Sequence, residues 1–351
     1  MLDLLVLGAG PAGCAAAIHA RRAGLSVMIL ESNERARPVP GETLHPGIEP
    51  ILMTLGVRET VLAAGFHRHR GVWIEWGGPI RFEPYGEDAD GPWHGFQADR
   101  RRLNEILLTA AIDIGVRVLR PATPQSVVLE KGCVVGVIAN DQEIRARWTA
   151  DATGSRAWLA NQLAKPERIH SPPMRAQFGW RKGRDGQPRL RTHPSGWEWQ
   201  APLGAKRTAW VSLRIDSLTD GVTPPLGTDV TWRIHADCAG PGYFLLGDAA
   251  ARLDPSSSHG VLRALMTGIF CAHAVANARR MRRTASAAID SYVHFVGHQF
   301  EHDVEAMRGF YQRHPSEAVA RLFMERGGAL RHARIFSSDE SRPIVPMGVG
   351  E

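Results

Sequence analysis

The sequence predicts an α/β protein: a three-layer domain with a parallel sheet plus a β-meander, an inserted domain that is mainly β, and C-terminal helices. Three patterns support this prediction. Residues 2–31 read as strand, helix and strand, and residues 165–235 contain short strand-like runs among many Pro, Gly, Arg and Trp residues. Long helical patterns cover roughly 259–282 and 285–313. With 351 residues and 44% hydrophobic side chains, the chain can form two domains with large cores.

The N-terminal unit is the clearest of these patterns. The apolar run 2–7 ends at a glycine, residues 11–24 form an alanine-rich helix, and residues 25–31 are a second buried strand. A strand, a helix and a strand in this order indicate parallel neighbours joined by a right-handed crossover. The unit is therefore the start of a Rossmann-like domain.

The rest of the chain divides into alternating patterns. Residues 48–65 look helical, strand-like alternation begins at Val72, and a helix and a strand return after residue 97. A meander follows, with turns at Lys131-Gly132 and Asn140-Asp141. We therefore expect three regions: a discontinuous first domain (1–70, 97–160 and 236–283), a β-rich second domain (71–96 and 161–235) and a C-terminal helical region (284–351).

Charge and cysteine content narrow the class of protein. The formal net charge is +6, but the arginines lie in small scattered groups, which argues against a nucleic-acid surface. The four cysteines form no CxxC or metal-type spacing, as in a reduced cytoplasmic protein. No signal-peptide pattern precedes the first strand, and no apolar run reaches the ~18 residues of a membrane span. We therefore expect a soluble, cytoplasmic protein without a membrane partner.

Glycines lie where the first strand gives way to the helix. Gly8, Gly10 and Gly13 fit the pattern GxGxxG. The first glycine permits a tight turn, the second lets a pyrophosphate approach, and the third lets the helix pack closely on the strand. Pro11 and Ala12 then begin a helix whose N-terminal N–H groups favour phosphates.

An acidic residue lies where a nucleotide-binding unit needs one. Glu31, followed by Ser32, ends the second strand about twenty residues after the glycines. A carboxylate there accepts hydrogen bonds from a ribose diol and repels a 2′-phosphate. The sequence therefore predicts that FAD or NAD binds, rather than NADP.

Two later segments distinguish FAD from NAD by resemblance. TADATGSRAWLA, with Ala152, Thr153 and Gly154, resembles the ATG segment of glutathione-reductase-type flavoproteins. GYFLLGDAAARLDPSSSHGVLRALMTG resembles the GDAAH…P…G segment of the p-hydroxybenzoate hydroxylase-like flavin monooxygenases and of their relatives, the flavin-dependent halogenases. The resemblance covers the first domain nearly end to end and implies FAD as the cofactor. Only one GxGxxG occurs, so a second, dedicated nicotinamide domain is not expected.

The resemblance also assigns cofactor contacts. It implies that Asp248, which follows Gly247, binds the ribityl chain and that the DPSSSHG loop lies beside the isoalloxazine ring. Pro255 belongs to this loop, and Gly260 and Val261 begin the helix after it. A helix N-terminus there would place positive charge near the flavin pyrimidine.

Two segments of the first domain complete the expected cofactor site. Arg100 stands three residues before a Leu-Asn pair, where the family has an arginine that contacts the cofactor. Glu42 and Thr43 belong to the segment GETLHPG. Glu42 either acts through its carboxylate or marks a loop that touches the flavin.

A tryptophan pair resembles a halogenase segment. GWEWQAPLG, with Trp197 and Trp199, resembles the WxWxIP segment of flavin-dependent halogenases, with Ala201 in place of Ile. On a strand the two tryptophans face the same side. They form either an aromatic wall for the substrate or packing between domains.

Other positions argue against halogenation. Halogenases of this type need a lysine after the GE-containing loop, but the first lysine is Lys131, and AGFHRHRGVWIEW contains none. The position of the glutamate that tryptophan halogenases carry beside the flavin matches Ser257. We therefore expect a chain that does not halogenate.

The function that we expect is oxygenation. The resemblance implies an FAD-dependent monooxygenase that hydroxylates an aromatic substrate through a flavin C4a-hydroperoxide, the substrate being a small or a protein-bound Trp- or phenol-like ring. His45 and His259 are the candidates for proton handling, or else are buried histidines satisfied by the backbone. NAD(P)H or a flavin reductase would supply electrons. The alternatives are a halogenase of an indole, phenol or pyrrole, a geranylgeranyl-reductase-like flavin reductase, and a flavoprotein partner in the maturation of another polypeptide.

No metal is expected. His294, His298 and His302 recur at helical spacing, but no fourth ligand is indicated, so we interpret them as a solvated helix face.

Overall fold

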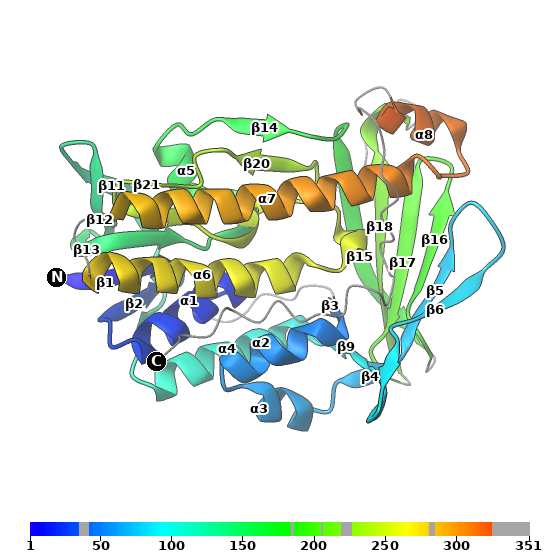
Figure 1. Cartoon of the computed structure of the whole chain (residues 1–351), viewed down its shortest axis with the longest axis horizontal. Coiled ribbons are helices and arrows are strands. Elements are labelled where there is room, and N and C mark those ends of the chain that lie inside the picture. The colour runs from blue at the N-terminus through cyan, green and yellow to red at the C-terminus, as the bar shows by residue number, and fades with distance from the viewer. Residues whose placement is uncertain (35–41, 184–185, 205, 219–226, 281–284, 325–351) are drawn as a thin grey trace.

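The computed structural model describes residues 1–324 except 35–41, 184–185, 205, 219–226 and 281–284. The last part of the predicted C-terminal region, 325–351, lies outside the described residues. Two large sheets organise the molecule. One lies beneath the long helices, and the other stands at one end of those helices (Figure 1).

The first large sheet is mainly parallel, as the sequence predicts. Its strands run in the order β10-β2-β1-β13-β12-β11, and β22 pairs with β13 and β21. The parallel strands are β1 (Leu2–Leu7), β2 (Val27–Leu30), β10 (Arg117–Leu119), β13 (Gln142–Asp151) and β22 (Tyr243–Leu245). β21 (Ala239–Gly240) is antiparallel to β22. Almost every residue of β1 is buried, which explains why its sequence is a continuous apolar run.

The predicted meander extends this sheet. β11 (Pro124–Glu130), β12 (Cys133–Ala139) and β13 are antiparallel neighbours. The turns fall at Lys131 and at Asn140-Asp141, as predicted, and these residues have left-handed φ values of 51°, 49° and 59°. The far half of β13 then joins β1 and β22, so that one strand links the meander to the parallel sheet.

Helices pack against the parallel strands. α1 (Pro11–Arg22) lies against α6 (Gly260–Arg280), and α6 lies beside α7 (Ala285–Tyr311) (Figure 1). At Gly268 an added Cβ would come within 2.3 Å of the Ala12 carbonyl oxygen, so glycine permits the close α1–α6 crossing. By length and apolar composition alone α6 could cross a membrane, but a buried core helix passes the same test, and here α6 packs against α1 and α7.

The remaining helices are shorter, apart from α4 (Arg100–Asp113), which contacts α1. The short α-helices are α2 (Glu49–Thr54), α3 (Arg58–Ala63), α5 (Trp158–Gln162) and α8 (Glu317–Met324). Single 3-10 turns are η1 (Pro46–Ile48), η2 (Gly154–Arg156), η3 (Asp216–Leu218), η4 (Gly247–Ala249) and η5 (Pro255–Ser257).

The second large sheet has seven strands. Their order is β19 (Thr228–Asp229), β15 (Met174–Lys182), β18 (Arg207–Ile215), β17 (Gly196–Pro202), β16 (Arg189–His193), β5 (Gly71–Glu75) and β6 (Arg81–Pro84). One face is turned to the first domain, because the indole N–H of Trp199 donates to Thr43 Oγ1 at 3.1 Å. We call this face the inner face of the seven-stranded sheet.

Small sheets complete the chain. One joins β3 (Glu42–Leu44), β9 (Gly95–Ala98) and β4 (His67–His69), and a second pairs β7 (Glu87–Asp88) with β8 (Gly91–Pro92). The third joins β14 (Glu167–Ile169), β20 (Arg233–His235) and β23 (Ala251–Arg252). The discontinuous division of the chain stays a proposal: β9 spans its boundary at residues 96 and 97, and the third sheet joins strands from both sides of it.

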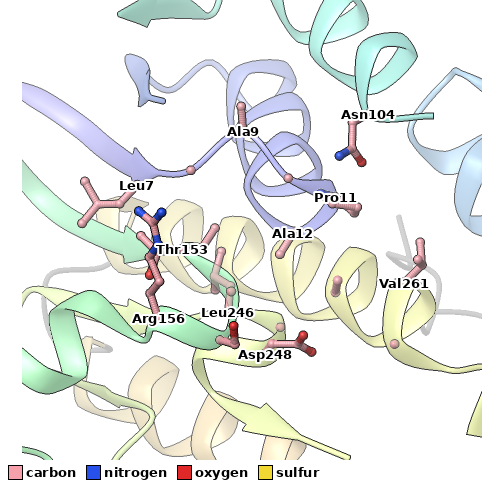
Figure 2. Close-up of a pocket in the computed structure, with 18 of the residues that line it drawn as sticks. Leu7, Ala9, Pro11, Ala12, Asn104, Thr153, Arg156, Leu246, Asp248 and Val261 are labelled. Carbon is pink, nitrogen blue, oxygen red and sulfur yellow. The ribbon is translucent and has the colours of Figure 1, made fainter. Parts of the chain in front are cut away.

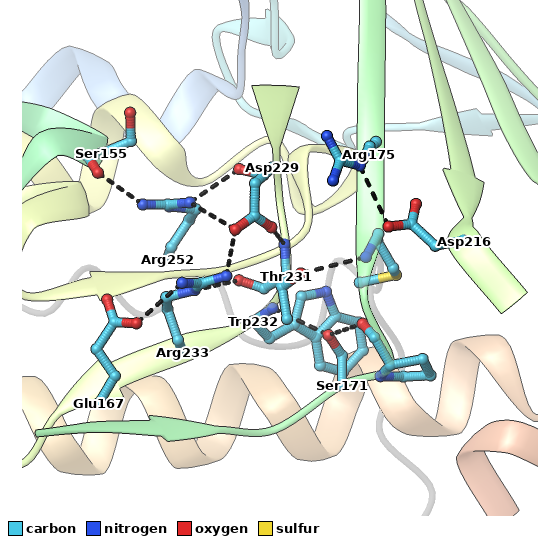
Figure 3. A network of polar contacts seen from close by, with 12 residues as sticks. Ser155, Glu167, Ser171, Arg175, Asp216, Asp229, Thr231, Trp232, Arg233 and Arg252 are labelled. Atoms are coloured by element: carbon cyan, nitrogen blue, oxygen red, sulfur yellow. Dashed lines mark hydrogen bonds and ion pairs between the residues drawn. The ribbon is translucent and has the colours of Figure 1, made fainter. Parts of the chain in front are cut away.

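An arginine network ties the two parts together at this third sheet (Figure 3). Arg252 donates to the carbonyl oxygens of Asp229 at 2.8 Å and Ser155 at 3.0 Å. Arg233 forms ion pairs with Asp229 and, at 2.9 Å, with Glu167. Because Ser155 and Asp229 both border the cavity described below, this network also fixes one wall of that cavity.

Candidate functional site

A cavity of about 990 Å³ opens where the carboxyl ends of the parallel strands meet the N-termini of α1 and α6 (Figure 2). Ligands of open α/β sheets bind at this edge. Most of the sequence-predicted cofactor residues line it: Gly8, Gly10, Pro11, Ala12, Glu31, Ser32, Glu42, Arg100, Ala152, Thr153, Gly154, Gly247, Asp248, Pro255, Gly260 and Val261. Segments that lie far apart in the sequence therefore converge on one pocket.

The glycines of the first turn have separate physical roles. Gly8 has φ +104°, and an added Cβ would come within 2.5 Å of the Ala152 carbonyl oxygen. Gly13 does not line the cavity, and its Cβ would come within 2.0 Å of the Gly8 carbonyl oxygen. At Gly10, by contrast, an added Cβ would meet nothing within 4 Å. Gly8 and Gly13 are thus required by the fold, and Gly10 leaves room on the cavity side.

Glu31 is held in place by backbone and side-chain donors. Its Oε2 accepts the Ala9 N–H at 2.9 Å, and its Oε1 accepts from the backbone and side-chain amides of Asn33 at 2.8 and 2.7 Å. A carboxylate has about four acceptor positions, so capacity remains for a ribose hydroxyl. Asn33 therefore orients the predicted acid, a role that the sequence pattern does not indicate.

An ion pair also lines the cavity. Arg100 Nη1 donates to Glu42 Oε2 at 2.7 Å, and Asn104 accepts from Arg100 Nε at 3.3 Å. Burial raises the pKa of Glu42, the cation of Arg100 lowers it, and the negative charge of Asp248 raises it again. Glu42, Arg100 and Asp248 are therefore brought together, although they are far apart in sequence.

Asp248 follows the end of β22 in the turn η4. Gly247 has φ +54° there, and its N–H donates to Thr267 Oγ1 of α6 at 3.0 Å. Figure 2 shows Asp248 and Val261 bordering the same part of the cavity. A carboxylate at this edge can accept hydrogen bonds from a chain of hydroxyl groups.

The two candidate catalytic histidines come close together but do not line the cavity. His45 Nδ1 accepts the Gly47 N–H at 3.1 Å, and its ring meets the edge of Tyr85 at a centroid distance of 4.8 Å. Burial, with a contribution from His259, lowers the pKa of His45 to about 4. Burial also lowers the pKa of His259, with Arg263 and His302 acting in the same direction and Asp303 opposing.

A buried network behind the 254–259 loop was not anticipated. Asp254 is 1% exposed, and its Oδ1 accepts from the N–H and hydroxyl of Ser256. Its Oδ2 accepts a hydrogen bond from the hydroxyl of Tyr311 at 2.5 Å. The Tyr311 hydroxyl oxygen in turn accepts the indole N–H of Trp197 at 2.8 Å. Burial raises the pKa of Asp254, and hydrogen bonds from Ser256 and Tyr311 oppose this change. The network fixes the loop to both α7 and β17.

The tryptophan pair shares the inner face, as the strand pattern predicts. Trp197 is fully buried, Trp199 is 8% exposed, and neither lines the cavity. In the described structure both therefore pack between domains, which is one of the two expected roles. A substrate role for them stays a prediction.

Aromatic side chains beside this pair are open to solvent. Phe178 pairs with Val211, and Val211 pairs with Trp199, so the three share the inner face. Phe178 and Trp180 are 42% and 39% exposed and contact each other edge to face. The inner face is thus enclosed at Trp199 and open toward the β15 edge.

Several cavity residues lack any sequence signal that we used. Arg156 borders the cavity next to the ATG segment, and Figure 2 shows it beside Thr153. Arg263 and Ala264 extend the cavity wall along α6. An exposed arginine after a glycine, or one inside a helix, is too common to single out from one sequence.

Metal and disulfide chemistry find no support in the described part of the chain. Among those residues no group of three or more His, Cys, Asp or Glu side chains is placed to hold a metal ion. All four cysteines (Cys14, Cys133, Cys238 and Cys271) are free. His294 and His298 lie on the exposed side of α7 with ring centroids 6.0 Å apart.

The residues of the cavity fit a flavin dinucleotide. Three glycines that border the cavity, Gly10, Gly154 and Gly260, have open space where a Cβ would point, so their backbone can be approached closely. The N-termini of α1 and α6 supply partial positive charge, and Glu31 and Asp248 supply acceptors for sugar hydroxyls. The volume suits a large cofactor.

Comparison with known proteins agrees with this geometry. The family model for FAD dependent oxidoreductase matches residues 3–161. A tryptophan 2-halogenase of Chondromyces crocatus is 28% identical over 337 residues, covering 78% of this chain and 60% of the relative. The digeranylgeranylglycerophospholipid reductase 1 of Methanopyrus kandleri is 27% identical over 345 residues, covering 87% of this chain and 88% of the relative. The chain thus spans less than two thirds of that halogenase.

Solved structures share the fold. The flavin-dependent halogenase CmlS superposes with a TM-score of 0.81 at 19% identity, covering 93% of this chain and 68% of the other. The peptidyl tryptophan dihydroxylase QhpG superposes with a TM-score of 0.73 at 20% identity, covering 95% and 80%.

Together the fold, the cavity and these similarities define an enzyme: an oxidoreductase whose cofactor is FAD. More narrowly, residues 3–161 match the FAD dependent oxidoreductase model, and the chain is similar to flavin-dependent halogenases in sequence and in fold, as the sequence motifs imply.

Proposed function

We propose that this enzyme is a monooxygenase that inserts oxygen into an aromatic ring. The observation that carries the proposal is the chemistry beside the 254–259 loop: two neutral imidazoles, His45 and His259, and no lysine among the described residues that line the cavity. Reduced FAD supplies the activation of dioxygen when it is bound. The protein then has to orient the ring, exclude water and move one proton.

His45 is suited to that proton transfer. Its lowered pKa keeps the imidazole neutral at pH 7, and its Nδ1 already accepts the Gly47 N–H. The Nε2 atom therefore carries the proton of the neutral ring and can donate a hydrogen bond. His259 is the second neutral imidazole in electrostatic contact with His45, so a proton gained by one disfavours protonation of the other.

The open inner face supports a large substrate. Phe178 and Trp180 continue the apolar face of Trp199 out to solvent, which suits an aromatic side chain carried by a polypeptide better than an enclosed small molecule. The similarity to a peptidyl tryptophan dihydroxylase is consistent with this substrate class. The chain has a single GxGxxG, so we expect no dedicated nicotinamide-binding domain. We propose that electrons come either from NAD(P)H, bound without such a domain, or from a separate flavin reductase.

Halogenation is the rival activity, because two of the compared proteins are halogenases. Ser257 stands where those acting on free tryptophan have a glutamate, and its hydroxyl donates to the Asp254 carbonyl oxygen at 2.9 Å. Ser257 therefore provides no carboxylate at the position of that glutamate. Oxygenation does not require a carboxylate there.

Product masses separate the two activities. The enzyme is supplied with reduced flavin, isotopically heavy dioxygen and bromide, together with free tryptophan, phenols, indoles, pyrroles and tryptophan-containing peptides. We expect enzyme-dependent products that contain heavy oxygen and no bromine, with the peptides reacting best. Brominated products would contradict the proposal. So would saturation of a prenyl substrate, offered in a parallel reaction, without incorporation of oxygen.

A further inference from the structure

Helices α6 and α7 carry a charge pair near the start of α6. Arg263 Nη1 lies 3.8 Å from Asp303 Oδ2, and the two side chains are only 13% and 17% exposed. Nη1 of Arg263 is buried and donates no hydrogen bond within the described chain. At Nη1 the guanidinium is therefore attracted to Asp303 by charge but forms no hydrogen bond, so this nitrogen could still donate one.

Arg263 also borders the FAD cavity. Gly260, Val261 and Ala264 line the cavity from the same turn of α6, so the cation stands beside the positive end of the helix. Asp303 is not among the lining residues and approaches Arg263 from α7. The cavity thus faces a positive group that a negative group restrains from behind.

The other end of α6 provides an internal comparison. Arg279 pairs with Asp3 at 3.1 Å, but its side chain is 48% exposed and does not line the cavity. Solvent screens that pair strongly. The Arg263–Asp303 pair is enclosed, and charges in such surroundings act over longer distances.

We propose that Arg263 and Asp303 are positioning residues that together set the electrostatic potential at the flavin end of the cavity. Two-electron reduction with uptake of one proton leaves negative charge on a flavin, so Arg263 favours the reduced form and Asp303 limits that preference. The same field acts on other titratable groups: His259 interacts with Arg263, Asp303 and His302, and His45 interacts with His259. Glu42 and Asp248 also line the cavity and interact with each other. The inference depends on FAD binding and is independent of the substrate that the enzyme oxidises.

The test is an equilibrium between the FAD-loaded protein and a reference dye, in which the reduced dye supplies both electrons. At a fixed dye potential, Asp303→Asn should raise the ratio of reduced to oxidised flavin about tenfold, and Arg263→Gln should lower it about tenfold. Arg263→Lys keeps the charge and should stay within about twofold of the parent. Bound FAD per chain is measured in parallel, so that loss of cofactor is not mistaken for a change in potential.

Matched variants separate this role from a general change in charge. Arg279→Gln removes the same charge from the same helix, and Glu301→Gln removes an exposed negative charge next to Asp303 on α7. Neither should change the ratio by more than about twofold. The proposal is overturned if Asp303→Asn and Arg263→Gln shift the ratio in the same direction, or if neither exceeds its control. If Arg263→Gln does not fold, the sign of the Asp303→Asn shift decides alone.

Discussion

At the scale of single residues, the glycines of the first turn show how one pattern serves two purposes. Gly13 adjoins the Gly8 carbonyl so closely that no other residue fits, which is a demand of the fold. Gly10 faces open space at the cavity, which is a demand of the ligand. The sequence pattern assigns these two roles, and the space around each glycine agrees with them.

This difference predicts opposite outcomes for two substitutions. Gly10→Val should leave the stability of the protein without FAD within about 1 kcal/mol of the parent, because nothing is displaced, yet should remove most bound FAD. Gly13→Val should destabilise the cofactor-free protein by several kcal/mol, roughly as overpacking does, because its Cβ would overlap a backbone oxygen. Denaturant unfolding of the stripped proteins and FAD content after purification measure both. Normal FAD content in Gly10→Val would refute the phosphate assignment.

Residue patterns predict local chemistry well and long-range contacts poorly. Glu31 was found because it follows a buried strand at the spacing of the glycine pattern, and Asp248 was found because the segment that contains it resembles a flavoprotein motif. Asp254, by contrast, acquires its meaning from Tyr311 and Trp197, which lie 57 residues away on either side. A sequence pattern within a window of ten residues cannot predict a contact between residues so far apart.

At the scale of elements, α6 and α7 owe their positions to polar contacts as well as to packing. Tyr292 of α7 donates to the Leu245 carbonyl oxygen at 2.6 Å, and Tyr311 donates to Asp254 at 2.5 Å. Both hydroxyls are buried. The Tyr311 hydroxyl, however, donates to a buried carboxylate, and the desolvation of a carboxylate costs more free energy than that of a carbonyl.

Removing these hydroxyls should therefore have unequal effects. Tyr311→Phe leaves Asp254 Oδ2 and the Trp197 N–H without their partner, and should lower the free energy of unfolding by about 3 kcal/mol. Tyr292→Phe leaves only a carbonyl oxygen, and should lower it by about 1 kcal/mol. Urea unfolding of the two variants provides the comparison. Equal losses would mean that the other groups that stabilise the carboxylate, Ser256 and Trp232, compensate for the missing hydroxyl.

The elements themselves were largely predictable. The strand-helix-strand start, the turns of the meander and the two long helices appear where the periodicity places them, because each is set by local burial and turn chemistry. The order of the seven-stranded sheet was not predictable, since β5 pairs in parallel with β16 across more than a hundred residues. The membrane-like composition of α6 is likewise explained only by its partners α1 and α7.

At the scale of the whole molecule, several histidines are neutral and buried or half-buried. Burial lowers the pKa values of His19, His45 and His69 to about 4, against an unperturbed 6.5. The unfolded chain therefore binds more protons than the folded one between these pH values. The stability that the neutral rings contribute is present above pH 6.5 and is lost as the pH falls toward 4.

The free energy of unfolding should accordingly fall between pH 7.5 and pH 5.5, as urea titrations at several pH values would measure. His69→Gln should reduce the slope, because His69 is 1% exposed and contributes to it directly. His298→Gln is the control, since its side chain is exposed in the folded state as well as in the unfolded one. Stability that stays constant or rises on acidification would contradict the assignment of neutral buried imidazoles.

The central claim is that one cavity, assembled from distant segments, holds the whole of FAD. Titration of the flavin-free protein with FAD, FMN and NAD tests it most directly. FAD should bind at least about a hundredfold more tightly than FMN, because the adenylate half meets Gly10, Glu31 and the N-terminus of α1. NAD, which lacks a ribityl chain for Asp248, should not displace FAD. Equal affinity for FMN and FAD, or tighter binding of NAD, would contradict the account.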